Sequence, residues 1–235
     1  MAELTGKTAI VTGASSGIGA GICRHFAEEG ANVVLAARRK DKLDALTEEI
    51  NKKGKGKAFA AVADVSVLSD MEKLVKYTKE TVGDADILVN NAGLVGSSRV
   101  RDGEVAEWEK MIDVNIKGVL YGIQAVLPDM ISRSSGHIIN TASVSGFEVT
   151  KTSTVYSATK FAVRSISQGL EKELARTGVR VTNISPGMVE TERNSESLAS
   201  YSRKPLQTDD IARAVVYAVT QPDYVNVNEI TVRPV

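Results

Sequence analysis

The chain has 235 residues, which is the size of one α/β domain and leaves no room for a second large core. Its 43% hydrophobic and 25% charged residues are typical of a globular protein. Lys plus Arg equal Asp plus Glu at 29 each, so the net charge favours neither nucleic acid nor an anionic membrane as a partner.

The start of the chain lacks the basic and long apolar stretches that mark a signal peptide. No run of about 18 uncharged apolar residues occurs, so we expect no membrane span. The single cysteine, Cys23, can form neither an internal disulfide nor a zinc site, and His25 and His137 lack carboxylate or thiol companions. These features predict a cytoplasmic protein without a metal.

Short apolar segments rich in Val and Ile alternate with longer segments of helical periodicity along the whole chain. We predict strands at 7–12, 32–37, 57–62, 87–90, 137–141, 179–184 and 229–232. The predicted helices are 17–29, 41–53, 67–82, 104–133 with a break near Asn115, 154–176 and 208–220.

The predicted strands are continuous apolar runs, as in a parallel sheet that helices cover on both faces. Regular strand–helix alternation predicts a single domain over 1–235, a Rossmann-type α/β fold with a doubly wound parallel sheet flanked by helices. Residues 188–207 are the least regular piece, polar and rich in Ser, Glu and Arg. We expect them to form a flap over the substrate.

The first predicted strand leads directly into TGASSGIG at 12–19. Gly13, Gly17 and Gly19 would allow a tight turn and the approach of a pyrophosphate to the N-terminus of the first helix. The spacing GxxxGxG matches neither GxGxxG nor a P-loop, and three glycines after a strand also suit a simple turn. The strand–turn–helix context favours a phosphate site.

Further polar residues follow other strands. NNAG at 90–93 ends the fourth predicted strand and Ser143 follows the fifth, at the sheet edge where such folds bind ligands. Tyr156 and Lys160 lie four apart in a predicted helix and therefore share one face. A nearby ammonium stabilises a phenolate, which would let a tyrosine act as an acid or base near neutrality. Pairs of this kind also arise by chance on surface helices. The prediction of a site therefore depends on the pair together with NNAG and Ser143.

These motifs together resemble the short-chain dehydrogenase/reductase family over essentially the full chain. The step of thirteen residues from Ser143 to Tyr156 also fits that family. The matching pieces are TGASSGIG at 12–19, Asp64-Val65, NNAG at 90–93, Asn115, Ser143, YSATK at 156–160 and Pro186-Gly187 followed by Thr191.

The resemblance implies catalytic roles for four residues. Tyr156 would be the general acid/base, and Ser143 would stabilise the charge that builds on the substrate oxygen. Lys160 would bind the nicotinamide ribose and lower the Tyr156 pKa. Asn115 would hold a water that links Lys160 to solvent.

The resemblance also implies a dinucleotide site. Asp64 would contact the adenine, Asn91 the adenine-side ribose region, and Val189 with Thr191 the carboxamide. The whole implied set is Gly13, Ser15, Ser16, Gly17, Ile18, Gly19, Arg38, Arg39, Asp64, Val65, Asn91, Ala92, Gly93, Tyr156, Lys160, Pro186, Gly187, Val189 and Thr191.

The end of the second predicted strand bears on the choice of cofactor. Members of the family that prefer NAD carry a carboxylate there, whereas residues 35–39 read LAARR and no acid follows before Asp41. The guanidinium of Arg38 offers a planar fork for a 2′-phosphate, and Ser15 could add a hydroxyl. A solvated helix start is the alternative, but cations are unfavourable at a helix N-terminus. The sequence therefore predicts NADP.

Substrate class is less well specified. Residues 108–130 and 225–235 resemble the branch of NADP-dependent 3-hydroxy acid (serine-type) dehydrogenases, but 188–207 are shorter than in that branch. Arg193 or Lys151 could pair with a substrate carboxylate, or both could be exposed charges. The alternatives are a broad-specificity carbonyl reductase of aromatic or aliphatic ketones and a binding protein that senses NADP without turnover.

A homo-oligomer, most often a tetramer, is also implied by the resemblance. The predicted helices 104–133 and 154–176 carry small and apolar residues on more than one face. A helix that is apolar beyond one stripe needs a second partner besides its own sheet, and two-fold symmetry supplies one.

Overall fold

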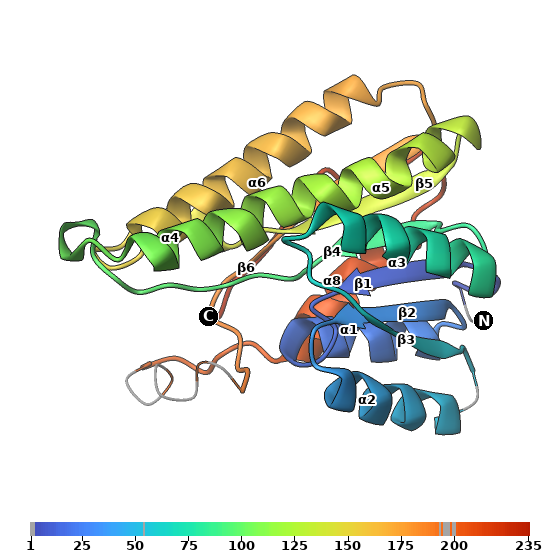
Figure 1. The fold of residues 1–235 in the computed structure, drawn as a ribbon, viewed down its shortest axis with the longest axis horizontal. Coiled ribbons are helices and arrows are strands. Elements are labelled where there is room, and N and C mark those ends of the chain that lie inside the picture. Colours follow the sequence, from blue (N-terminus) through green and yellow to red (C-terminus); the bar gives the residue numbers. More distant parts are fainter. Residues whose placement is uncertain (1–2, 54, 193, 195–197, 199–200) are drawn as a thin grey trace.

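The computed structural model describes residues 3–53, 55–192, 194, 198 and 201–235. Seven parallel strands form one sheet in the order β3-β2-β1-β4-β5-β6-β7, with helices on both faces (Figure 1). The strands are β1 Thr8–Thr12, β2 Asn32–Ala37, β3 Ala58–Val62, β4 Ile87–Asn90, β5 Gly136–Thr141, β6 Val179–Pro186 and β7 Glu229–Val232.

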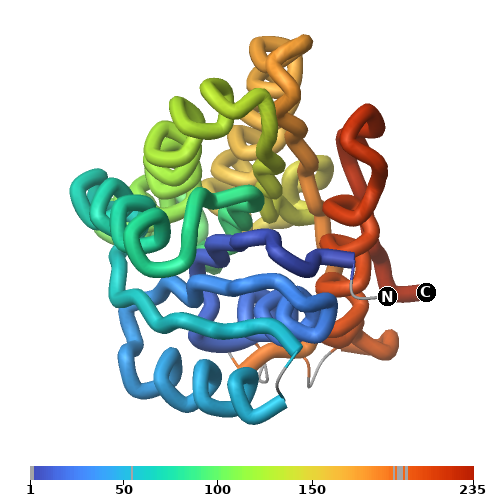
Figure 2. Tube along the Cα trace, turned by 90° about the vertical axis from the view of Figure 1, so that its right-hand side faces the viewer, coloured from blue at the N-terminus to red at the C-terminus, as the bar shows by residue number. Residues whose placement is uncertain are grey.

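The helices lie in two layers, as the chain traced from another side also shows (Figure 2). One apolar core joins the sheet to α1, α2 and α8, and a second joins it to α3, α5 and α6. The α-helices are α1 Gly17–Glu28, α2 Lys40–Lys53, α3 Leu68–Thr81, α4 Val105–Ile112, α5 Gly118–Ser132, α6 Thr154–Glu173 and α8 Thr208–Val219. The doubly wound parallel sheet is confirmed.

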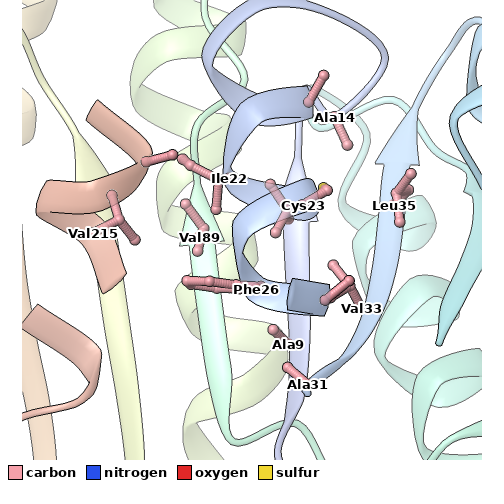
Figure 3. Close-up of a cluster of buried hydrophobic side chains, with 14 of the residues drawn as sticks. Ala9, Ala14, Ile22, Cys23, Phe26, Ala31, Val33, Leu35, Val89 and Val215 are labelled. Carbon is pink, nitrogen blue, oxygen red and sulfur yellow. The ribbon is translucent and has the colours of Figure 1, made fainter. Parts of the chain in front are cut away.

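The first core fixes α1, the helix that follows the glycine-rich turn. Phe26 and Ile22 of α1 are fully buried between the sheet and α8, near Val89 and Val215 (Figure 3). Burying a side chain of this size contributes about 1.5–3 kcal/mol relative to leaving it exposed. The apolar face of α1 therefore holds its N-terminus at the edge of the sheet where β1 ends.

The predicted helix 104–133 is indeed interrupted. A π-helical segment, η2 Asp113–Lys117, separates α4 from α5 and contains Asn115, which is almost fully buried. Single π-helical turns are frequent at functional sites because the extra residue re-aims a side chain. The predicted helix 154–176 stops earlier, at Glu173, since Arg176 and Gly178 adopt positive φ angles that no helix can continue.

Short elements escaped the sequence analysis. The 3₁₀-helices η1 Val100–Asp102 and η3 Val144–Gly146 each span three residues, too few to show a periodicity. Within 188–207, the described residues include a parallel bridge between Val189 and Leu206. No helix among the described residues is long and apolar enough to cross a membrane.

Candidate active site

The glycine-rich turn after β1 packs directly on the turn after β4. Gly13 has a φ of +65°, and a Cβ there would lie 2.8 Å from the Cα of Ala92. The Thr12 hydroxyl accepts hydrogen bonds from the amides of Asn91 (3.0 Å) and Ala92 (3.1 Å) and donates to the Val89 carbonyl. The order of the sheet strands reverses between β1 and β4, and this is where doubly wound sheets bind ligands.

Asn91 has a structural task in this turn. Its side-chain amide donates to the Thr12 carbonyl at 3.0 Å and lies close to Gly13 and Gly19. The side chain therefore fixes the glycine-rich turn, and the expected contact between Asn91 and a ribose stays a prediction.

The N-terminus of α1 opens onto this turn. Ser16 occupies the N-cap position, but its side chain makes no capping hydrogen bond and instead accepts one from Arg39. Backbone N–H groups at the start of a helix attract anions. The Arg39 fork reaches both Ser15 Oγ (2.9 and 3.2 Å) and Ser16 Oγ (2.7 Å). A guanidinium therefore lies beside the turn where a phosphate would bind.

Arg38 points elsewhere. Its guanidinium lies 3.7 Å from the Asp64 carboxylate and its side chain is 64% exposed. Arg39 rather than Arg38 contacts Ser15, and the expected contacts of Arg38 and Ser15 with a 2′-phosphate stay predictions. Burial raises the pKa of Asp64, but hydrogen bonds from Ser66 and the nearby Arg38 charge outweigh it, so the pKa is lowered and Asp64 is anionic.

Lys160 is buried beneath the catalytic tyrosine candidate. It is 5% exposed, and its Nζ donates to the Thr141 carbonyl at 2.8 Å. Burial lowers the pKa of Lys160 to about 8. Its Nζ lies 5.8 Å from the centroid of the Tyr156 ring, one helical turn away on α6. An amine with such a pKa can gain or lose a proton near neutral pH.

Ser143 follows the end of β5 and lies near Tyr156. Its hydroxyl donates to the Pro186 carbonyl at 3.4 Å and lies close enough to Tyr156 to influence its pKa. Burial raises the pKa of Tyr156, and the Ser143 hydroxyl lowers it by less, so the net shift is upward. The expectation that Lys160 lowers the pKa of Tyr156 stays a prediction.

Asn115 lies in the π-helical segment η2, close to Gly93 and Lys160. Its Oδ1 accepts from the Leu94 amide at 2.8 Å, and its Nδ2 donates to the Leu94 carbonyl and to Thr159 Oγ1. A Cβ on Gly93 would lie 3.6 Å from both Asn115 Oδ1 and Lys160 Nζ. Asn115 and Lys160 therefore flank Gly93 at the end of β4.

The segment after β6 also reaches the glycine-rich turn. The Gly187 amide, which follows Pro186, donates to the Val232 carbonyl at 2.7 Å. Val189 is buried, and the Thr191 methyl lies 3.3 Å from the Cβ position of Gly17.

Neither candidate partner for a substrate carboxylate is tested, and part of the predicted flap lies outside the described residues. Arg193 and residues 195–197 and 199–200 lie outside the described residues, and Lys151 is exposed. Among the described residues, no group of three or more His, Cys, Asp or Glu side chains could hold a metal ion.

A profile of the short chain dehydrogenase family matches residues 7–202. The chain belongs to that family. Relatives of this short-chain dehydrogenase include an uncharacterized oxidoreductase of Staphylococcus saprophyticus, 55% identical over the full length of both chains. A second, from Staphylococcus aureus strain MW2, is 54% identical over the same extent. The protein is an oxidoreductase.

Solved structures of the family superimpose closely on the chain. The closed form of a serine dehydrogenase complexed with NADP⁺ has a TM-score of 0.89 and 36% identity, covering 96% of this chain and 94% of its own. A gluconate 5-dehydrogenase from Burkholderia cenocepacia, in complex with NADP and tartrate, has a TM-score of 0.90 and 32% identity, covering 98% and 94%. Both structures are NADP complexes of those proteins.

The sequence analysis gave no role to some residues that build the site of this short-chain dehydrogenase. Thr12 and Thr159 fix Asn91 and Asn115; both lie within the motifs at 12–19 and 156–160, but the motifs alone do not show these contacts. A buried chain of hydrogen bonds runs from Asn90 to Asn140 (2.9 Å) and on to Ser167 (3.0 Å). The sequence signal for this chain of hydrogen bonds was that each of two successive predicted strands has an Asn near its end.

Proposed function

We propose that the protein is an NADP-dependent oxidoreductase that interconverts a small alcohol and its ketone or aldehyde. The observation that supports this is the meeting of Ser143, Tyr156, Lys160 and Asn115 at the carboxyl edge of the sheet, beside the glycine-rich turn. A binding protein that only senses NADP would have no use for an acid/base pair at this place.

In the reducing direction, the substrate carbonyl oxygen accepts hydrogen bonds from Ser143 and Tyr156. NADPH, when bound, supplies the hydride that forms the new C–H bond. Tyr156 gives its hydroxyl proton to the substrate oxygen, and Ser143 stabilises the negative charge as it develops. Lys160, with a pKa of about 8, returns a proton towards Tyr156, and Asn115 connects Lys160 to solvent. Oxidation reverses each step.

The residues around the turn fit NADP better than NAD. β2 ends in Ala37 followed by two arginines, so no carboxylate is present to bind both ribose hydroxyls or to repel a phosphate. Arg39 with Ser15 and Ser16 would hold the 2′-phosphate, and Arg38 would approach it from the side of Asp64. The NADP complexes among the similar structures support this choice.

For the substrate, we propose a 3-hydroxy acid such as serine, on the likeness to serine dehydrogenases. A specific observation favours a second candidate, a carbonyl reductase of aromatic or aliphatic ketones. Val95 and Val149 are 77% and 60% exposed, and they follow the turns that carry Gly93 and Ser143. Exposed apolar side chains beside the site suit an apolar substrate better than a carboxylate.

The experiment is a paired assay of NADP reduction with L-serine and other 3-hydroxy acids, and of NADPH oxidation with diketones and aromatic ketones. Tyr156→Phe serves as the matched inactive variant in both directions. Turnover with one class identifies the substrate. Tight NADPH binding without turnover of either class would favour the sensing protein and contradict the proposal.

A further inference from the structure

Arg164 lies on the same face of α6 as Tyr156 and Lys160, two turns after the tyrosine. Its side chain is only 18% exposed. Both arms of its guanidinium bind the Glu229 carboxylate, at 2.9 Å through Nε and 3.0 Å through Nη2. This bidentate geometry is the strongest and most directional that an arginine forms with a carboxylate.

The remaining donor of Arg164 reaches the segment that carries Ser143. Its Nη1 donates to the Gly146 carbonyl at 3.0 Å, and its guanidinium stacks on the Phe147 ring at 3.5 Å. Ser143 caps the 3₁₀-helix η3 by accepting from the Ser145 amide, and the Gly146 amide donates back to the Ser143 carbonyl. Arg164 therefore holds the end of the same short turn whose beginning is Ser143.

The 3₁₀-helix η3 packs closely on α6. A Cβ on Gly146 would lie 2.8 Å from Arg164 Cδ and 3.0 Å from the Lys160 carbonyl oxygen. The backbone of η3 thus rests on the helix between Lys160 and Arg164. A shift of this turn along α6 would move Ser143 relative to Tyr156.

Glu229 anchors the arginine from the other side. It begins β7, the edge strand, and lies in register with Asn183 of β6. The Asn183 amide donates to the same Glu229 oxygen, at 3.1 Å, that accepts from Arg164 Nε. The carboxylate is therefore fixed to the sheet, and through Arg164 it fixes the turn.

We infer that Arg164, held by Glu229, is a positioning residue that sets the distance between Ser143 and Tyr156. This inference rests on the roles proposed above for Ser143 and Tyr156. Arg164 touches neither the substrate nor the cofactor in this account. It acts through Gly146 and Phe147 on the turn that begins at Ser143, and so on the position of the Ser143 hydroxyl beside Tyr156.

The test compares Arg164→Leu, Arg164→Lys and Glu229→Gln with Ser143→Ala. We expect Arg164→Leu to lower the turnover of 2,3-butanedione with NADPH by about ten- to a hundredfold, because small misplacements of a reacting group have effects of this size. Arg164→Lys keeps the charge but loses the fork and the stack, so it should not rescue turnover. NADPH affinity should stay unchanged in all of them.

A second readout needs no substrate. Tyrosine labelled with ¹³C at Cζ reports the Tyr156 pKa by NMR, assigned with Tyr156→Phe. Because the Ser143 hydroxyl lowers this pKa, both Ser143→Ala and Arg164→Leu should raise it. The double variant should match Ser143→Ala alone, since both changes remove the effect of the same hydroxyl on Tyr156.

Arg24→Leu is the matched control. Arg24 forms an equally bidentate pair with Glu49, at 2.9 and 2.8 Å, between α1 and α2, which pack on the opposite face of the sheet from α6. It should destabilise the fold without changing turnover or the Tyr156 pKa.

Unchanged turnover and Tyr156 pKa in Arg164→Leu would overturn the inference, as would equal losses in Arg24→Leu. If Arg164→Leu does not fold, Arg164→Lys and Glu229→Gln decide by the same two readouts. Failure of the proposed function would give a different result, because turnover would then survive in Tyr156→Phe.

Discussion

Arg39 offers the sharpest test of cofactor choice. Its guanidinium donates to Ser15 and Ser16 at the start of α1, where we propose that the 2′-phosphate of NADP binds. Arg39→Ala removes charge-assisted hydrogen bonds that form only with NADP. Hydrogen bonds to charged groups contribute about 1.5–3 kcal/mol, which corresponds to a loss of about 10- to 150-fold in NADP affinity. NAD has no phosphate at this position, so its affinity should not change.

Isothermal titration of NADP and NAD into the wild type, Arg39→Ala and Arg38→Ala measures both effects directly. Arg38 is 64% exposed and lies near Asp64, so solvent screens it and its loss should weaken NADP binding by less. Arg39→Ala variants that lose both cofactors equally would refute the reasoning. A larger loss of NADP affinity in Arg38→Ala than in Arg39→Ala would mean that Arg38 is the main ligand of the 2′-phosphate.

Three further outcomes are expected. Tyr156→Phe should lower turnover by about a hundredfold or more while NADPH binding survives, measured by single-turnover kinetics and fluorescence titration. Burial lowers the pKa of His137 to about 3, whereas its pKa in the unfolded chain is 6.5, so between these values only the unfolded chain takes up the proton. The free energy of unfolding should therefore fall by about 2 kcal/mol between neutral pH and pH 5, and urea unfolding of His137→Gln should lack that part of the fall. Leu120, Ile131 and Phe161 are 40% or more exposed on α5 and α6, which supports a homo-oligomer; sedimentation near 25.1 kDa at micromolar concentration would contradict it.

The fold was largely predictable because its signals are local. Apolar runs such as 32–37 and 87–90 predicted the strands, and their continuity predicted a parallel sheet covered on both faces. Even the break at Asn115 was foreseen, since a helix of that length is unusual in one domain. The early end of α6 was missed because it depends on the positive φ of Arg176, which no pattern of side chains reveals.

The meeting of the candidate residues at one sheet edge was easier to predict than their individual contacts. Motif spacing brought Ser143, Tyr156 and Lys160 to one edge of the sheet, yet the pKa of Tyr156 depends on desolvation, which only the packing shows. Likewise, two adjacent arginines are equivalent in sequence, and backbone direction decides that Arg39 rather than Arg38 faces Ser15. The cytoplasmic location and the flap over 188–207 stay predictions.

One row of polar residues explains how a site made from several strands keeps its register. Asn90, Asn140, Asn183 and Glu229 are paired in register across β4, β5, β6 and β7. Hydrogen bonds from this row reach α5 at the Val119 carbonyl and α6 at Ser167 and Arg164.

Apolar contacts alone would let α6 slide along the sheet with little change in buried area. A buried polar group that loses its partner costs about 1–3 kcal/mol, so each of these bonds penalises such a slide. Because Tyr156 and Lys160 lie on α6 while Ser143 extends from β5, fixing the helix on the sheet also fixes the distances between them. The same row that places polar side chains in the core therefore gives Ser143, Tyr156 and Lys160 one defined arrangement.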